Sequence, residues 1–234
     1  MKKPDHPPSA FWKTRPGIAL QIVLVLIPSA LVLQAGNLLL AGVIVSALVC
    51  WRCLKLQGKS WADLGFHRPS SLPRTLLTAL ASTLGLLVLT IPLRRYVTTL
   101  LNQPPNLEAF KALEGNLIAL FVGLCIVWTV AAFGEEFLFR GFLLNSFHRL
   151  FPAGFPSDKT KWAISLFVTS ILVGIGHAYQ GLTGMILTAV IGFGFGLVYL
   201  ANKRNLWSSI LTHGFYDTIA FLLLFAGIRM DDWL

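Results

Sequence analysis

Long apolar stretches alternate with short polar segments along the whole chain. A helix needs about 20 apolar residues to cross a hydrocarbon core about 30 Å thick. Strict alternation of apolar and polar residues, which is typical of a membrane β-barrel, is absent from the sequence. The pattern predicts an all-α fold, a polytopic transmembrane helical bundle with about seven to eight spanning helices. The expected spans are 17–34, 38–51, 75–93, 116–133, 162–178, 183–201 and 206–226.

The ends of some spans are open to more than one interpretation. We expect the fourth span to continue as a helix through Glu135 to Leu150. An eighth element could lie in 94–116 or in 139–150. Within the loop 96–116, the amphipathic segment LEAFKALEG (107–115) predicts a short helix that lies in the membrane interface.

This map divides the chain into four parts. We expect a cytosolic N-terminal tail at 1–16, N-terminal transmembrane helices and a linker at 17–114, a helical core at 115–226 and a C-terminal tail at 227–234. The N-terminal tail is basic and interrupted by prolines, and the apolar run after it lacks a cleavage site made of small residues. The sequence therefore predicts a retained first helix.

Composition and charge support a membrane protein. Of the 234 residues 55% are hydrophobic and 12% charged, the mean hydropathy is +0.70, and the net charge is +9. Fifteen of the 19 Lys and Arg residues fall on one side of the map when its segments alternate across a membrane. Basic loops face the cytosol, so the N-terminus is expected inside. The charge therefore has a topological role, and we expect membrane lipids as partners and no nucleic acid. Oligomeric state stays open.

Cys50 and Cys53 form a CxxC motif at the end of an apolar span, and Cys125 is the third cysteine. A CxxC can serve redox chemistry or bind metal. No second CxxC is present, so we interpret these cysteines as ordinary helix residues without a disulfide framework.

The first cluster of charges inside an apolar region is AAFGEEFLFRGFLL. A charge at bilayer depth costs at least about 2.5–3.5 kcal/mol, so it is retained where it is paired, hydrated or functional. Glu136 and Arg140 are four residues apart and share a helix face, whereas Glu135 points about 100° away. Glu135 is therefore a candidate general base. The alternative is a purely structural cluster at a helix end.

Two further clusters carry histidines. His177 ends an apolar span beside glycines that allow close helix packing, although a membrane histidine can also be a hydrogen-bonded packing residue. His213 and Asp217 are four residues apart on one face of the last span, so Asp217 can orient His213. Gly192 and Gly196 form a GxxxG face that predicts close helix contact.

Convergence of these clusters on one cavity would satisfy more of their desolvation cost than three separate burials. We expect that cavity to open toward the side that carries Lys203, Arg204 and the linker 52–74. The spacing along the helices also requires that the cytosolic ends of the fourth and fifth spans project beyond the hydrocarbon, with the cavity open to the cytosol.

The three clusters resemble the CPBP family, which includes type II CAAX prenyl proteases and the bacteriocin-processing and immunity proteins of the Abi or lysostaphin-resistance-protein-A-like group. The family pattern is EExxxR, FxxxH and HxxxN or HxxxD. Glu135, Glu136 and Arg140 match its first motif, and His213 and Asp217 match its third. His177 matches the second except that Val173 replaces the phenylalanine. The resemblance covers roughly 115–225.

The resemblance implies an intramembrane endopeptidase that hydrolyses peptide bonds of membrane-associated, prenylated or peptide substrates. Glu135 would activate the water with help from His177, and His213 and Asp217 would stabilise the oxyanion. Asp217 would either donate in its protonated form or hold His213, and Glu136 and Arg140 would serve structure and substrate contact. We expect no cofactor and location in the bacterial inner (plasma) membrane.

Three alternatives remain on the sequence. Zinc bound by Glu135, His177 and His213 is the rival mechanism, because three N/O ligands and a water suit catalytic zinc. A non-catalytic immunity or scaffold protein with the same fold is the second. A proton-coupled transporter is the third, although no repeats with matching broken helices are visible.

Overall fold

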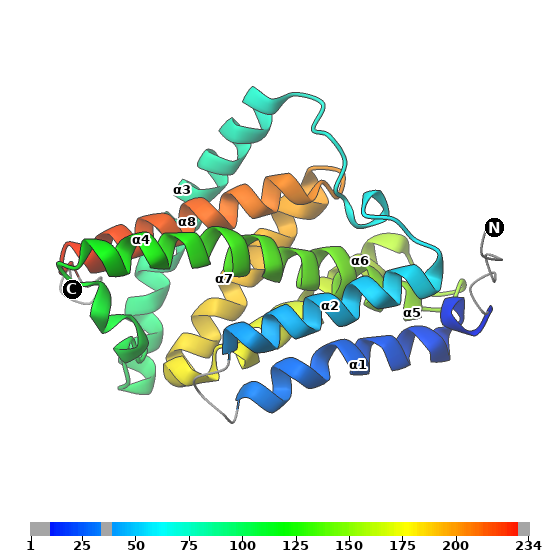
Figure 1. Cartoon of the computed structure of the whole chain (residues 1–234), viewed down its shortest axis with the longest axis horizontal. Helices are drawn as coiled ribbons and strands as arrows, with labels where there is room; N and C mark the ends of the chain where they lie inside the picture. Colours follow the sequence, from blue (N-terminus) through cyan, green and yellow to red (C-terminus); the bar gives the residue numbers. More distant parts are fainter. Residues whose placement is uncertain (1–9, 34–38, 229–234) are drawn as a thin grey trace, which may run out of the picture.

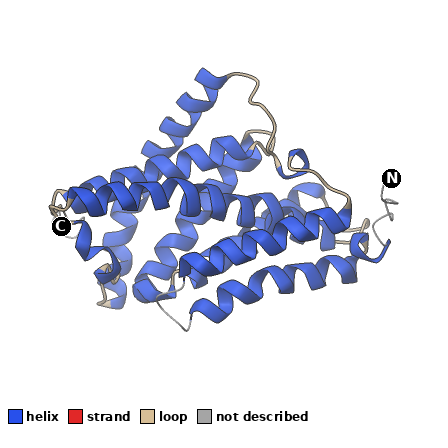
Figure 2. Cartoon of the chain, viewed as in Figure 1, coloured by secondary structure: helices blue, strands red, loops and turns tan. Residues whose placement is uncertain are grey.

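The computed structural model describes residues 10–33 and 39–228, and within these ranges every regular element is helical (Figure 2). This confirms the predicted all-α class. The α-helices are α1 (Arg15–Leu33), α2 (Leu39–Gln57), α3 (Leu72–Leu101), α4 (Leu117–Ile126), α5 (Asn145–Leu150), α6 (Asp158–Gly176), α7 (Gly181–Ala201) and α8 (Leu206–Phe225). Shorter elements are η1 (Ala10–Lys13), η2 (Ala62–Leu64), η3 (Glu108–Leu113), η4 (Val127–Glu135), η5 (Phe137–Leu144) and η6 (Ala178–Gln180).

Five helical stretches of the described chain are long and apolar enough to cross a membrane. They are Leu72–Leu101, Leu117–Leu150, Asp158–Gly176, Ala178–Ala201 and Leu206–Phe225, with Arg15–Leu31 as a shorter apolar helix. The protein is therefore an integral membrane protein. These stretches overlap six of the seven expected spans, whereas the expected span 38–51, which falls in α2, is not among them.

Helices that follow one another pack as neighbours, α1 on α2 and α6 on α7, while α3 packs on α7 and α8. The first half of α3 projects from the bundle (Figure 1). The 58–71 linker and the α7–α8 turn lie toward one end of the molecule, and the 102–116 segment and the end of α8 lie at the other (Figure 1). In this view α1, α2 and α5 extend beyond the start of α8 (Figure 1).

The fourth span is one continuous helical stretch of 34 residues, Leu117–Leu150, as expected. Its middle is π-helical in η4 and η5, which meet at Glu136. The wider π turn is found frequently at functional sites. The side chains of Glu135 and Glu136 are therefore set by a wider turn than the α-helix that the sequence suggested.

Helix α3 is longer than the sequence pattern indicated. It begins after the N-cap Ser71, which accepts a hydrogen bond from the backbone N–H of Arg74, and ends at Asn102 in the left-handed conformation. Arg94 and Arg95, which follow the expected span 75–93 in the sequence, therefore lie on the helix. Arg94 is buried and Arg95 is exposed, so the first arginine belongs to the interior of the bundle.

The linker after α2 folds back onto the start of α8. Leu64 is 2% exposed, and the backbone N–H of Leu206 donates to the carbonyl of Gly65. Gly65 has φ +104°, and a Cβ there would lie 2.2 Å from the carbonyl oxygen of Arg204. Only glycine fits this close approach.

Small residues let α6 and α7 approach closely, as the GxxxG pattern predicts. A Cβ on Gly192 would lie 3.1 Å from the side chain of Val173, and one on Gly196 would meet Leu166. Gly174 faces the backbone of Met185. This contact brings His177, at the end of α6, next to the start of α7.

Two other expectations concern segment 107–115 and the cysteines of the CxxC motif. Segment 107–115 contains the 3₁₀ turn η3, and its Phe110 contacts Phe221 and Tyr179. Leu107 and Phe110 of this segment line the interior cavity, so the segment also contributes to its wall. Cys50 and Cys53 are free thiols buried in the core, as ordinary helix residues would be.

Candidate active site

An ion pair joins the two charged residues that share a helix face in the first motif. Nη1 of Arg140 donates to Oε1 of Glu136 over 2.7 Å, and both side chains are almost fully buried. The second guanidinium nitrogen of Arg140 donates to the carbonyl of Gly192, and the guanidinium lies 5.6 Å from the ring centre of Phe195. The predicted pairing is confirmed, and it ties η5 to α7.

The same carboxylate also reaches the third motif. Nδ1 of His213 donates to Oε1 of Glu136 over 3.0 Å, and Nε2 of His213 lies 3.2 Å from Oδ2 of Asp217. The His213 ring stacks on Phe195 with 4.5 Å between ring centres. Neither the contact with Glu136 nor the platform of Phe195 follows from helical spacing, because both join residues on different helices.

The two contacts of His213 determine its protonation. An ionised carboxylate can only accept hydrogen bonds, so both ring nitrogens must carry hydrogen when both carboxylates are ionised. Arg140, Glu136, His213 and Asp217 then form a row of alternating charges whose sum is zero. Such pairing is what permits charge to be buried in a membrane protein.

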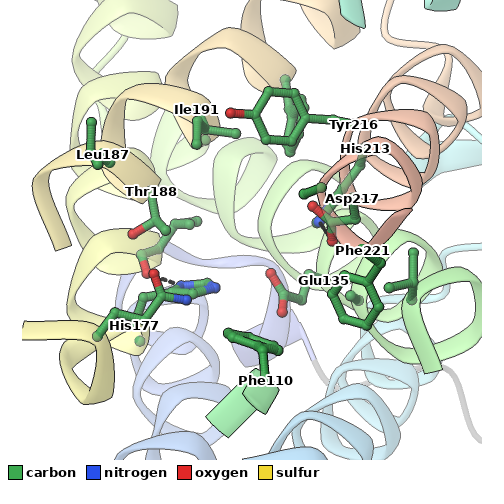
Figure 3. A pocket seen from close by; sticks show the side chains of 18 of the residues that line it. Phe110, Glu135, His177, Leu187, Thr188, Ile191, His213, Tyr216, Asp217 and Phe221 are labelled. Carbon is green, nitrogen blue, oxygen red and sulfur yellow. Dashed lines mark hydrogen bonds and ion pairs between the residues drawn. The ribbon is translucent and has the colours of Figure 1, made fainter. Parts of the chain in front are cut away.

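A cavity of about 340 Å³ lies beside this row, within the helical bundle. Glu135, His177, His213 and Asp217 all line it, together with Arg140, whereas Glu136 does not. Figure 3 shows Glu135 and His177 facing each other across the cavity, with Asp217 on the side of His213. The structure thus brings the three clusters together, and Glu135 is the glutamate that faces the open space.

His177 caps the end of α6, and its Nδ1 lies 2.9 Å from the carbonyl oxygen of Val173. A carbonyl only accepts, so Nδ1 carries the hydrogen and Nε2 of the neutral ring has a free lone pair. Val173 is the residue that departs from the family pattern. It contributes its backbone here, so the departure leaves the histidine contact intact.

The rest of the cavity wall is mostly apolar and aromatic. Phe110, Tyr179 and Phe221 form one side of it, and the hydroxyls of Thr90 and Tyr216 hydrogen-bond to each other at 2.9 Å. Arg94 of α3 also lines the cavity and is 7% exposed. Sequence reasoning missed Arg94 because the apolar run appeared to end at residue 93. Helical periodicity could have found it. Arg94 follows Thr90 by four residues, so the two lie on the same face if the helix continues past residue 93.

The cavity does not lie next to the linker 52–74 and the α7–α8 turn, toward which we expected it to open. Its lining includes Leu107, Phe110, Tyr179 and Gln180, at the end of the bundle opposite the α7–α8 turn and the linker (Figure 1). The reason is geometric, because His177 follows 19 residues of helix after the N-cap Ser157 and so lies at the far end of α6. Lys203 and Arg204 do not line the cavity.

Among the described residues, no group of three or more His, Cys, Asp and Glu side chains is placed so that it could hold a metal ion. Glu135, His177 and His213 share the cavity, but they do not converge as a ligand set in this structure. The ring nitrogens of His213 already face Glu136 and Asp217.

Comparison with known proteins places this site in a family. Residues 117–219 match the family model for type II CAAX prenyl endopeptidase Rce1-like proteins. Searches of curated proteins and of solved structures gave no match. The matched segment falls within the predicted core 115–226 and contains all three motifs. The predicted family is therefore confirmed, and residues 117–219 of this integral membrane protein belong to the CPBP family of CAAX proteases.

Proposed function

We propose that this protein is an intramembrane endopeptidase in which Glu135 activates the attacking water. The observation that carries the proposal is the different use of two adjacent glutamates. Glu136 is fully buried and is engaged by Arg140 and His213, whereas Glu135 lines the cavity and faces His177. A general base needs a carboxylate that can reach water and substrate, and Glu135 meets this requirement.

The reaction uses the groups around the cavity in sequence. Water held by Glu135 attacks the peptide carbonyl carbon and transfers a proton to the carboxylate. The C–N bond then breaks as the proton passes to the leaving amine, and the free Nε2 lone pair of His177 suits it to hold or relay that proton. The products are a new carboxylate and a new amine.

The developing oxyanion requires a nearby positive charge or hydrogen-bond donor. His213 lines the cavity and carries two hydrogens when Glu136 and Asp217 are ionised. Asp217 then acts by holding His213, which supports the second of the two roles considered for it. Glu136 and Arg140 are assigned to holding His213 and α7 in place.

The cavity also limits the substrate. Its walls are mostly apolar, and it lies inside a bundle of helices that span the membrane. A hydrophobic or membrane-associated peptide, including a prenylated one, matches this environment better than a soluble polar chain does.

Peptide cleavage by the purified protein tests the proposal. The protein in lipid nanodiscs would be incubated with quenched fluorescent peptides, with and without a prenyl group, and the products identified by mass spectrometry. Glu135→Gln keeps the shape of the side chain and removes the base, so turnover should fall at least a thousandfold. The control is Glu108→Gln, because Glu108 is exposed on η3 and pairs only with Lys111 among the described residues.

The result has three clear forms. Cleavage by the wild type and by Glu108→Gln, with loss in Glu135→Gln at normal protein levels, supports the assignment. Substantial turnover by Glu135→Gln overturns the role of Glu135. If no peptide from a membrane-proteome comparison changes between wild type and Glu135→Ala, a non-catalytic scaffold with the same fold becomes the better explanation.

A further inference from the structure

Asn145 is a half-buried residue behind the site that the mechanism above does not use. It is the first residue of α5 and directly follows the π-helical stretch η5, which carries Arg140. Its side-chain nitrogen Nδ2 donates to the carbonyl of Arg140 over 2.9 Å and to that of Gly141 over 2.8 Å. Because carbonyls only accept, the nitrogen of this amide must face them. Asn145 does not line the cavity, so it can affect the reaction only through these contacts.

The end of η5 requires an additional hydrogen-bond donor. A π-helix bonds each N–H to the carbonyl five residues earlier, whereas an α-helix bonds it to the carbonyl four residues earlier. Where the first pattern changes to the second, one carbonyl is left without a backbone N–H. An unpaired carbonyl is costly inside a membrane, because no water replaces the missing donor. Asn145 stands at this change, and its amide therefore stabilises the π-helical geometry of η5.

The amide of Asn145 is itself held from the side of α7. Its Nδ2 also donates to the hydroxyl oxygen of Tyr199 over 2.9 Å, and this hydroxyl donates to the carbonyl of Leu64 in the linker over 3.2 Å. Tyr199 is 1% exposed. A Cβ on Gly65 would lie 3.1 Å from the ring of Tyr199, so the ring fits closely against the backbone of the linker. These contacts fix the orientation of the amide.

Arg140 connects this support to the reacting groups. Its carbonyl is bonded by Asn145, and its guanidinium donates to Glu136, which also accepts from His213. Without the amide, η5 would be free to tighten toward an α-helix, in which a shift by one residue turns the chain by about 100°. A rotation of this size would misplace Glu136 and the adjacent Glu135.

We infer that Asn145 is a positioning residue for the reaction, which holds η5 in its π-helical register so that Glu136 fixes His213 and Glu135 faces the cavity. This inference rests on the proposed peptidase function. The alignment of the reacting groups determines the rate of the chemical step, whereas the apolar cavity wall determines how tightly the peptide binds. Loss of the amide should therefore lower kcat and leave substrate affinity almost unchanged.

Replacement of the amide tests the inference. Asn145→Ala removes all three hydrogen bonds, whereas the hydroxyl of Asn145→Ser can still donate to the carbonyl four residues earlier, that of Gly141. Asn202→Ala is the matched control, because Nδ2 of Asn202 also donates to the carbonyl four residues earlier and Asn202 does not line the cavity. We expect kcat to fall at least about thirtyfold in Asn145→Ala and about threefold to tenfold in Asn145→Ser, and to stay within about twofold in Asn202→Ala. Kd for the peptide, measured in the Glu135→Gln background, should change less than about threefold in each variant.

The state of His213 provides a second readout that does not depend on turnover. NMR of protein with isotope-labelled histidine would report the ring nitrogens, and His213→Gln would identify the signal of His213. This signal should move in Asn145→Ala and in the same direction, but less, in Asn145→Ser, because both variants loosen the Arg140 turn that holds Glu136 against the ring. It should stay in place in Asn202→Ala.

Each outcome supports or overturns the inference. If kcat of Asn145→Ala stays within about threefold of the wild type, or falls no further than that of Asn202→Ala, the inference is wrong and the proposed function stands. If the wild type cleaves no peptide, the proposed function fails, and the movement or constancy of the His213 signal then supports or overturns the positioning role. If Asn145→Ala does not fold, Asn145→Ser decides, and an unchanged kcat with an unmoved His213 signal overturns the inference.

Discussion

Arg140 donates to Glu136 over 2.7 Å from one helical turn away, and neither side chain has appreciable contact with solvent. This pair determines the roles of the two adjacent glutamates, because Glu136 is engaged inside the bundle and Glu135 is left to face the cavity. It also connects to the last helix, since the same oxygen of Glu136 accepts from His213.

Breaking this pair should destabilise the protein. Glu136→Ala and Arg140→Ala each leave a buried charge without its partner, at an expected cost of about 3–5 kcal/mol. The double variant should lose less stability than the sum of the two single variants, because it removes both charges. Thermal unfolding in detergent would measure the three losses. Additive losses would show that the two residues act independently.

Replacement of Asp217 should separate its two candidate roles. Asp217→Asn keeps an oxygen that can accept from Nε2 of His213, so kcat should stay within about tenfold of the wild type. Asp217→Ala removes the contact and should lower kcat more than a hundredfold, with a smaller effect on KM. A protein as active with alanine as with asparagine would argue against a role in holding His213.

Chelators should leave peptidase activity unchanged if the reaction uses no metal. The His213 nitrogens face Glu136 and Asp217, which makes them poor candidates for a shared zinc site. Activity would be followed during prolonged treatment with EDTA or 1,10-phenanthroline, with a known zinc peptidase as positive control. Inhibition that stoichiometric zinc reverses would instead favour Glu135, His177 and His213 as ligands.

Close packing of α6 on α7 should make Gly174 intolerant of a side chain. A Cβ there would lie 2.5 Å from the carbonyl oxygen of Met185 and 2.9 Å from the Cβ of Ala189. Gly174→Ala should therefore cost about 1–3 kcal/mol. Gly85→Ala is the control, because nothing lies within 4 Å of a Cβ at that helical position, and it should be neutral or stabilising. Equal melting temperatures for the two variants would contradict the packing.

Lys59 should make stability depend on pH. Burial, assisted by the charge of Arg149, lowers its pKa from 10.5 to about 8 in the folded protein. Below pH 8 the folded state therefore holds a disfavoured charge, and the cost disappears as the pH rises from 8 to 10.5. Lys59→Met should raise the melting temperature at pH 7, and its advantage over wild type should shrink across that window. A constant difference from pH 7 to 10.5 would exclude Lys59 as the cause.

The sequence by itself determined the class of the protein and the identity of its main polar groups. Apolar runs of membrane length can only be satisfied by helices, so the spans follow from hydropathy. The spacing of Glu136 and Arg140, and of His213 and Asp217, placed each pair on one face, since local periodicity fixes contacts within a helix. Both contacts are present in the structure.

The tertiary structure decided everything that joins different helices. Local periodicity carries no information about which helix faces which, so it could not predict the bond from His213 to Glu136 or the stacking on Phe195. It also could not show that Arg94 enters the cavity, because a charge near the end of an apolar run looks like the start of a loop. The end of the bundle at which the cavity lies depends on how the helices are offset along one another, and only their packing sets that offset.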